Sequence, residues 1–191
     1  MEDGIIKYNC QWKKTSAIEH SELQNLIFWR DRAKALGYIG TYPNHIPYGN
    51  ISIKVEKGFL ISGSNTGHLD RANDEHFSFV HNWDIQQNKL WCKGPMKASS
   101  ESLTHAIIYD SLPQVKAILH IHQAALWEKY YSLLASTAPE IAYGTPEMAW
   151  AVQKLVIQNN TENLFLMQGH RDGLVSYGGN LDDCFKAFEH L

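Results

Sequence analysis

The stretch VKAILHIHQ at residues 115–123 decides how this chain folds. Val115 to Ile121 form a short apolar run rich in β-branched side chains, which is typical of a buried strand. Because successive strand side chains point to opposite faces, His120 and His122 share one face at the carboxyl end of this strand. Two such imidazoles can bind one metal ion, although the spacing also fits histidines that fill a core or lie on the surface.

A metal site needs further ligands from elsewhere in the chain. Catalytic sites commonly use three protein ligands and leave a position open for water or substrate. His170 is the preferred third ligand because it follows the apolar segment LFLM and precedes another predicted strand, in a loop that can reach a cleft. His68 is the reserve candidate, and four histidines are more typical of exposed or structural positions: His45, His76, His81 and His105.

Strands and helices are predicted on both sides of this run. Two hairpins precede the run: strands 51–55 and 59–62, which turn at Gly58, and strands 77–84 and 89–93. Two strands follow it, at 163–168 and 174–177. Five helices are predicted at 18–36, 101–110, 124–134, 145–158 and 181–190. The predicted N-cap is Ser16 for the first helix, Ser99 or Ser100 for the second and Asn180 for the last. Gly37 is predicted to end the first helix. This mixture predicts one layered α/β domain, residues 1–191, with a largely antiparallel sheet.

Charge and cysteine content limit the classes of partner and the compartment that we expect for this protein. The formal charge is -3 with both signs interspersed, so no basic surface is expected for nucleic acid or an anionic membrane. Three cysteines without a close pair fit a reducing compartment, and neither a signal peptide nor a membrane span is recognisable. We expect a cytoplasmic protein with no nucleic-acid or membrane partner.

Three short segments are candidates for binding an anion. The helix start at SSES, Ser99 to Ser102, offers hydroxyls and free amide groups, although an ordinary N-cap has the same residues. GNIS at 49–52 and SNTG at 64–67 have the composition of ordinary turns, which explains them without any ligand. None of the three is specific when taken alone.

The order of the motifs along the chain resembles the class II aldolase/adducin family, particularly fuculose phosphate aldolase. These motifs are GNIS, the Thr-Gly turn, SSE, HxH, the segment YGT and a late histidine before a Gly-containing strand. The resemblance runs from about Leu23 to Leu191. It implies a three-layer α/β/α fold and one divalent metal ion per chain, which we expect to be Zn²⁺, bound by His120, His122 and His170. It also implies that Glu101 is the proton-transfer catalyst. The positions that match a phosphate cradle are Asn50, Thr66, Gly67, Ser99 and Ser100.

The sequence departs from the family pattern at three points. Two residues, Arg171 and Asp172, separate the late histidine from its glycine, and SGSNTG is longer than the usual turn. The chain also lacks the longer tail that supplies a catalytic tyrosine in some aldolases. A tyrosine acid would therefore be internal, and the candidates, each of which could instead serve packing, are Tyr130, Tyr131 and Tyr143.

The resemblance implies retro-aldol cleavage of a short, phosphorylated ketose through a metal-stabilised enediolate. Glu rather than Asp at position 101 favours a lyase over an epimerase. The alternatives are an epimerase, dehydratase or decarboxylase acting on a related sugar or hydroxy-keto acid, and a non-enzymatic, adducin-like interaction module. The resemblance also predicts a homotetramer.

Overall fold

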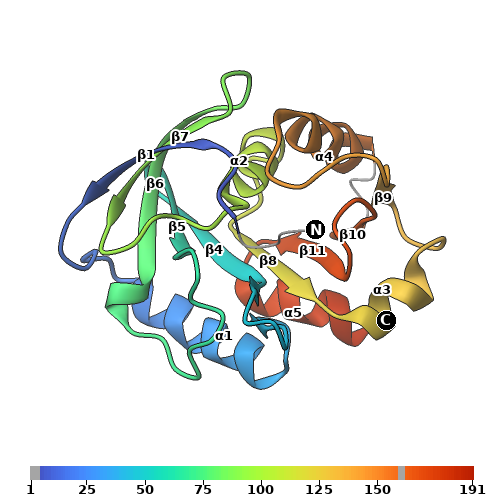
Figure 1. The fold of residues 1–191 in the computed structure, drawn as a ribbon, viewed down its shortest axis with the longest axis horizontal. Helices are drawn as coiled ribbons and strands as arrows, with labels where there is room; N and C mark the ends of the chain where they lie inside the picture. The colour runs from blue at the N-terminus through green and yellow to red at the C-terminus, as the bar shows by residue number, and fades with distance from the viewer. Residues whose placement is uncertain (1–4, 159–161) are drawn as a thin grey trace.

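A nine-stranded sheet runs through the computed structural model, which describes residues 5–158 and 162–191 (Figure 1). Its order is β1-β7-β6-β5-β4-β8-β11-β10-β9. Neighbouring strands are antiparallel except at the two edges, where β1 pairs with β7 and β9 with β10 in parallel. The strands are β1 Asn9–Lys14, β4 Asn50–Val55, β5 Gly58–Ser62, β6 Phe77–Asp84, β7 Lys89–Gly94, β8 Ala117–His122, β9 Ser136–Thr137, β10 Leu164–Met167 and β11 Gly173–Gly178. A separate small sheet pairs β2 Gly40–Thr41 with β3 Pro47–Tyr48.

The predicted strand that carries the two histidines is confirmed as β8. It starts at Ala117 rather than Val115, and all six of its residues are buried. Strands β4 and β11 flank it, so that His120 lies opposite Asn50 on one side and Val175 on the other. This central place explains the continuous apolar run before the histidines, because both faces of the strand are covered.

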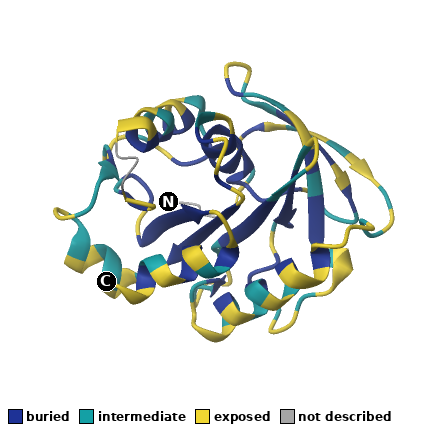
Figure 2. Cartoon of the chain, turned by 180° about the vertical axis from the view of Figure 1, so that it is seen from behind, coloured by how far each residue is buried: buried dark blue, intermediate teal, exposed yellow. Residues whose placement is uncertain are grey.

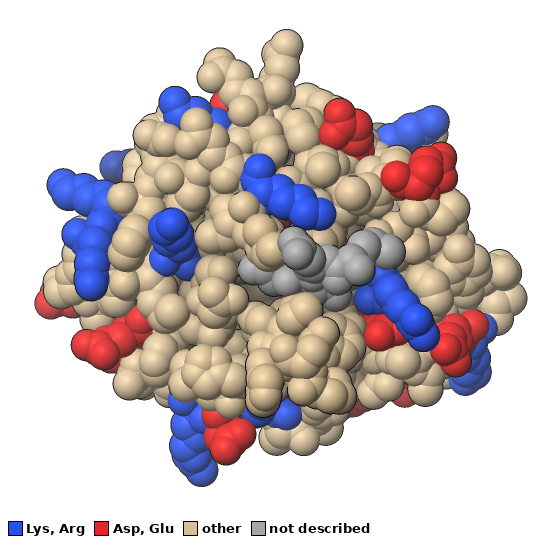
Figure 3. All heavy atoms as spheres, in the orientation of Figure 1, with Lys and Arg blue, Asp and Glu red and all other residues tan. Residues whose placement is uncertain are grey.

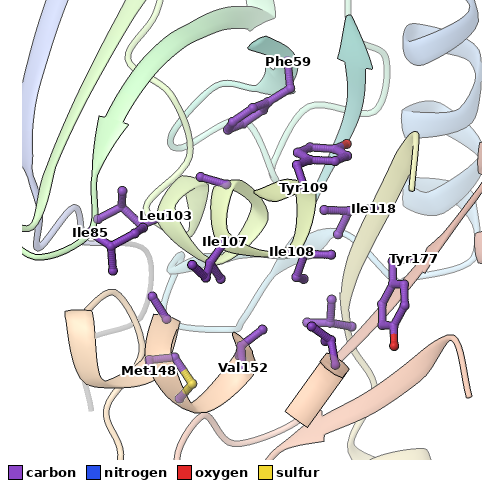
Figure 4. Packing of buried hydrophobic residues seen from close by; sticks show 14 of the residues in the cluster. Phe59, Ile85, Leu103, Ile107, Ile108, Tyr109, Ile118, Met148, Val152 and Tyr177 are labelled. Atoms are coloured by element: carbon purple, nitrogen blue, oxygen red, sulfur yellow. The ribbon is translucent and has the colours of Figure 1, made fainter. Parts of the chain in front are cut away.

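Helices cover both faces of the sheet and form three layers (Figure 1). Helices α2 (Ser102–Ser111) and α4 (Pro146–Gln158) pack on one face, where Ile118 of β8 joins their apolar side chains (Figure 4). Helices α1 (Leu23–Ala35) and α5 (Leu181–Glu189) cover the other face and contact Leu119. The strands are buried between them while the outer helix faces are exposed (Figure 2). The predicted three-layer α/β/α architecture with a mostly antiparallel sheet is therefore confirmed.

Two predicted helix starts were wrong. Helix α1 begins at Leu23, not residue 18, because a turn intervenes in which the Leu23 amide donates to the His20 carbonyl at 3.1 Å. Its N-cap residue is Glu22, not Ser16. Helix α2 begins at Ser102 with Glu101 as N-cap residue, so the two preceding serines form a turn outside the helix.

Other boundaries follow the prediction more closely. Asn180 caps α5 by accepting a hydrogen bond from the Asp183 amide at 2.9 Å. Helix α3, however, spans Ala124–Tyr130, so its predicted end at Leu134 was wrong, because a turn follows in which the Leu133 and Leu134 amides donate to the Tyr130 carbonyl at 3.0 and 3.1 Å. The turn between β4 and β5 requires glycine, since a Cβ at Gly58 would lie 2.0 Å from the Val80 carbonyl oxygen. Edge strands β1 and β9 were not predicted.

The surface agrees with the mixed charge of the sequence. Lysine, arginine and acidic side chains are interspersed over the face drawn in Figure 3. Within residues 5–158 and 162–191, no helix is both long and apolar enough to cross a membrane.

Candidate metal centre and anion pocket

Strand alternation and one turn bring three histidines together. His120 and His122 point from β8 toward the face covered by α2, and His170 reaches them from the turn between β10 and β11. Their exposed fractions are only 1%, 5% and 3%, in that order. One ring nitrogen from each can be chosen so that all three lie within 4.8 Å of one another, and the Nε2 atoms of His122 and His170 are 2.9 Å apart.

Glu101 lies at the buried end of α2, against the same histidines. Its two carboxylate oxygens are 2.9 Å from Nδ1 of His120 and 3.1 Å from Nδ1 of His170. Both distances are within hydrogen-bonding range. Burial raises the pKa of this carboxyl, but the neighbouring His120 and His170 outweigh burial and hold the pKa well below its usual value.

The donor set fits a divalent cation. Burial, then the neighbouring His170 and His120, lower the pKa of His122 well below its usual value, so this imidazole is neutral and can offer a lone pair. Two imidazole nitrogens on one tetrahedral zinc ion lie about 3.3 Å apart, close to the His122–His170 separation. Nε2 of His120 has no partner among the described residues. The three buried histidines could therefore hold a metal ion.

The residues expected to bind phosphate line the same pocket as this cluster. Asn50, at the start of β4, has its amide nitrogen 3.2 Å from Nδ1 of His120, while its side-chain oxygen has no partner among the described residues. The other four belong to two loops that line the pocket: Thr66, Gly67, Ser99 and Ser100.

Helix α1 holds the Thr66–Gly67 loop from behind. Arg30, only 1% exposed, donates to the Thr66 carbonyl at 2.6 Å, and Lys34 donates to the Gly67 carbonyl at 3.0 Å. A Cβ at Gly67 would lie 2.1 Å from the Gly40 carbonyl oxygen, so only glycine allows this close approach. The two carbonyls of this loop are thus tied to helix α1.

The serine loop is fixed by the amino-terminal segment. The Tyr8 hydroxyl contacts the carbonyl oxygens of Ala98 and Ser99 at 3.1 and 2.9 Å, and the Ser102 hydroxyl donates to the same Ser99 carbonyl at 2.7 Å. Ser100 lines the pocket next to this anchored segment.

The remaining histidines do not join the cluster. His68, the reserve ligand, is exposed, as are His45 and His81. His105 is fully buried one turn after Glu101, with Nδ1 2.6 Å from the Ser52 hydroxyl, and burial lowers its pKa to about 3.

Two tyrosines that the sequence did not single out contact His122. Tyr48 stacks on its ring with centroids 5.3 Å apart, and the Tyr42 hydroxyl lies 2.7 Å from its Nδ1. Among the tyrosines considered from sequence, Tyr143 is buried with its ring centroid 4.6 Å from that of His170. The other two pack elsewhere: Tyr130 contacts the Leu191 carbonyl and Tyr131 packs on Trp127.

A family model described as "Class II Aldolase and Adducin N-terminal domain" matches residues 44–191, which include all three histidines and Glu101. The chain is also 25% identical over 160 residues to 3-oxo-tetronate 4-phosphate decarboxylase of Haemophilus influenzae, covering 75% of this chain and 72% of that protein.

Solved structures share the fold at lower sequence identity. YgbL of Klebsiella pneumoniae superposes with a TM-score of 0.67 at 20% identity, covering 90% of this chain and 86% of that chain. L-fuculose-1-phosphate aldolase of Thermus thermophilus gives a TM-score of 0.61 at 21% identity, with 87% and 86% covered.

Proposed function

The chain belongs to the class II aldolase and adducin family, and we propose that it is a metal-dependent lyase that cleaves a short, phosphorylated ketose by retro-aldol chemistry. The observation that carries this proposal is the convergence of His120, His122 and His170 beside Glu101, in one pocket that loop residues also line. A divalent cation bound there, which we expect to be Zn²⁺, supplies Lewis-acid polarisation of the substrate carbonyl.

Glu101 performs the proton transfer in this proposal. Its carboxylate accepts the proton of the substrate hydroxyl whose carbon becomes the aldehyde, and later returns a proton to carbon of the other fragment. Its burial excludes water from the carboxylate, and its two oxygens lie close to imidazoles on one side of the pocket. This position is suited to moving a proton at the reacting carbons.

The loop residues and Asn50 bind the phosphate group in this proposal. Hydroxyls of Ser99 and Ser100, the amide of Asn50 and the backbone at Thr66 and Gly67 supply donors, while the Thr66 hydroxyl itself donates to the Gly63 carbonyl at 2.8 Å. Phosphate binding then fixes the distance from the anionic end of the substrate to Glu101.

Decarboxylation is the second candidate, because the Haemophilus influenzae relative is a decarboxylase of a phosphorylated 3-oxo acid. It requires the same cation and cradle, but the group lost is carbon dioxide rather than an aldehyde. Epimerase and dehydratase reactions share the polarised carbonyl. A non-enzymatic, adducin-like module requires none of these residues to be catalytic.

The test is a product analysis with purified protein supplied with Zn²⁺. We expect phosphorylated short ketoses to release an aldehyde, detected by a coupled reductase, and the same sugars without phosphate to react much more slowly. Carbon dioxide release from 3-oxo-tetronate 4-phosphate would favour the decarboxylase instead. A metal-loaded protein that transforms none of these compounds would support the interaction module.

Three further features belong to this proposal. The sheet and its two apolar clusters support a single domain over residues 1–191. The three free cysteines suit a reducing cytoplasm. We also propose a homotetramer with sites at subunit boundaries; light scattering that gives the mass of a monomer would contradict it.

A further inference from the structure

Tyr42 links one histidine of the cluster to a buried aspartate. Its hydroxyl lies 2.7 Å from Nδ1 of His122 and donates to Oδ2 of Asp172 at 3.1 Å. The three residues are far apart in sequence, since Tyr42 is 80 positions from His122 and 130 positions from Asp172. They therefore meet only through the fold.

The direction of these hydrogen bonds follows from the chemistry of the groups. The Tyr42 hydroxyl has a single proton, and it donates this proton to Oδ2 of Asp172. The hydroxyl oxygen is then left to accept from His122, which must carry its proton on Nδ1. The Nε2 lone pair of His122 is thereby directed toward Nε2 of His170, 2.9 Å away, and so faces another candidate ligand of the metal site.

Asp172 is held in this place by an unusual backbone. Its φ is +66°, a left-handed conformation that costs a non-glycine residue about 1 kcal/mol or more. Its carbonyl accepts from the Gln123 amide at 2.9 Å, which ties it to the residue after His122, and the residue is only 9% exposed. Asp172 belongs to the two-residue insertion between His170 and Gly173.

We propose that Tyr42 and Asp172 are positioning residues that fix the Nδ1–H tautomer and the ring orientation of His122 for binding a cation. This inference rests on the proposed metal-dependent function. A histidine ligand commonly donates its other ring N–H to a carboxylate or carbonyl, and here a tyrosine hydroxyl stands between the ring and the carboxylate. The inserted Asp172 thus gives His122 a partner that a direct His-Gly sequence would not supply.

The first test compares Tyr42→Phe with Tyr48→Phe in chelator competition for Zn²⁺. Tyr42→Phe removes only the hydroxyl that contacts His122, and we expect its zinc affinity to fall about 10- to 100-fold. Tyr48→Phe is the matched control, because Tyr48 stacks on the same ring while its hydroxyl contacts the Gly37 carbonyl. Its zinc affinity should match the wild type. Equal affinity in Tyr42→Phe and wild type would overturn the inference.

The second test needs no metal. The ¹⁵N spectrum of metal-free protein at mildly alkaline pH should show His122 as the Nδ1–H tautomer, and Tyr42→Phe should shift it toward Nε2–H. Asp172→Gly relieves the left-handed strain, removes the carboxylate and should shift the tautomer in the same direction. An unchanged tautomer in both variants would refute the positioning role. If wild-type protein fails to bind zinc while the tautomer shifts as expected, the proposed metal function fails and the tautomer assignment stands.

Discussion

The two walls of the pocket are built in different ways. On the histidine wall, side chains from β8 and the turn after β10 converge, and their close contacts are with other side chains. On the loop wall, the backbone near Thr66 and Gly67 is shaped by contacts with Arg30 and Lys34 of α1 and with Gly40. The geometry of the histidine wall thus depends on the chemical identity of its side chains. The geometry of the loop wall depends instead on its backbone conformation and on the residues of α1 that hold it.

This contrast explains where each wall is sensitive to substitution. Replacing one side chain on the histidine wall removes a donor or a base and leaves the strand pairing intact. Adding a single carbon on the loop wall displaces backbone, because that wall has no spare space at Gly67.

Glu101→Gln should give the largest effect on catalysis. It distinguishes a loss of proton transfer from a loss of the metal site. The amide keeps the shape of the buried side chain but cannot accept a proton, so we expect turnover to fall about two to four orders of magnitude. Metal content should stay at the wild-type level. Steady-state kinetics with paired metal analysis checks this, with Glu56→Gln as control because the Glu56 side chain is 88% exposed. Unchanged turnover would remove Glu101 from the mechanism.

Gly67→Ala tests the loop wall. The new Cβ would lie 2.1 Å from the Gly40 carbonyl oxygen, so the loop must move. We expect the free energy of unfolding to fall by about 1–3 kcal/mol and KM for phosphorylated substrates to rise. Metal content should not change.

The control for this change is Gly179→Ala, whose Cβ would meet its nearest neighbour, Asp183 Oδ2, at an ordinary 3.4 Å. Urea unfolding and zinc analysis on both variants make the comparison. Loss of zinc in Gly67→Ala would show that the two walls are not independent.

The effect that is smallest near neutral pH is a pH dependence of stability from His105, behind the histidine wall. Burial lowers the pKa of this imidazole from 6.5 to about 3. Below pH 6.5 the unfolded chain therefore takes up a proton that the folded protein does not bind until about pH 3. Stability is lost as pH falls through this window, by up to about 1.4 kcal/mol per pH unit.

Urea titrations of wild type and His105→Asn at two pH values inside that window measure the contribution. The variant lacks the titrating ring, so its stability should fall less steeply by about one proton. Equal slopes would mean that His105 is protonated in the folded protein.

The sequence predicts the strand part of the histidine wall well, because the pattern that places His120 and His122 lies within one short segment. The apolar run before His120 fixes a buried strand, and alternation then places His120 and His122 on one face. His170 was preferred as third ligand from its loop position after an apolar segment, whereas joining Glu101 to the histidines required the family resemblance, since nothing in a single sequence measures the distance between separate segments. The same holds for the loop residues that line the pocket.

What the sequence did not predict depends on tertiary contacts. Strand β1 is the segment NCQWKK at the edge of the sheet, where only Cys10 and Trp12 alternate with exposed polar residues; so short an alternation does not predict a strand without the pairing with β7. No sequence pattern marks Arg30 of α1, which is buried and donates to the Thr66 carbonyl. The contacts of Tyr42 join positions that no local pattern connects.

The central claim, that His120, His122 and His170 form a metal site, is tested most directly by metal analysis of purified protein. Plasma mass spectrometry of wild type and of His120→Ala, His122→Ala and His170→Ala, each confirmed as folded by circular dichroism, measures it. We predict about one zinc or similar divalent ion per chain in the wild type and loss of that ion in all three variants. Substoichiometric metal in wild-type protein that neither added ions nor these substitutions change would contradict the claim.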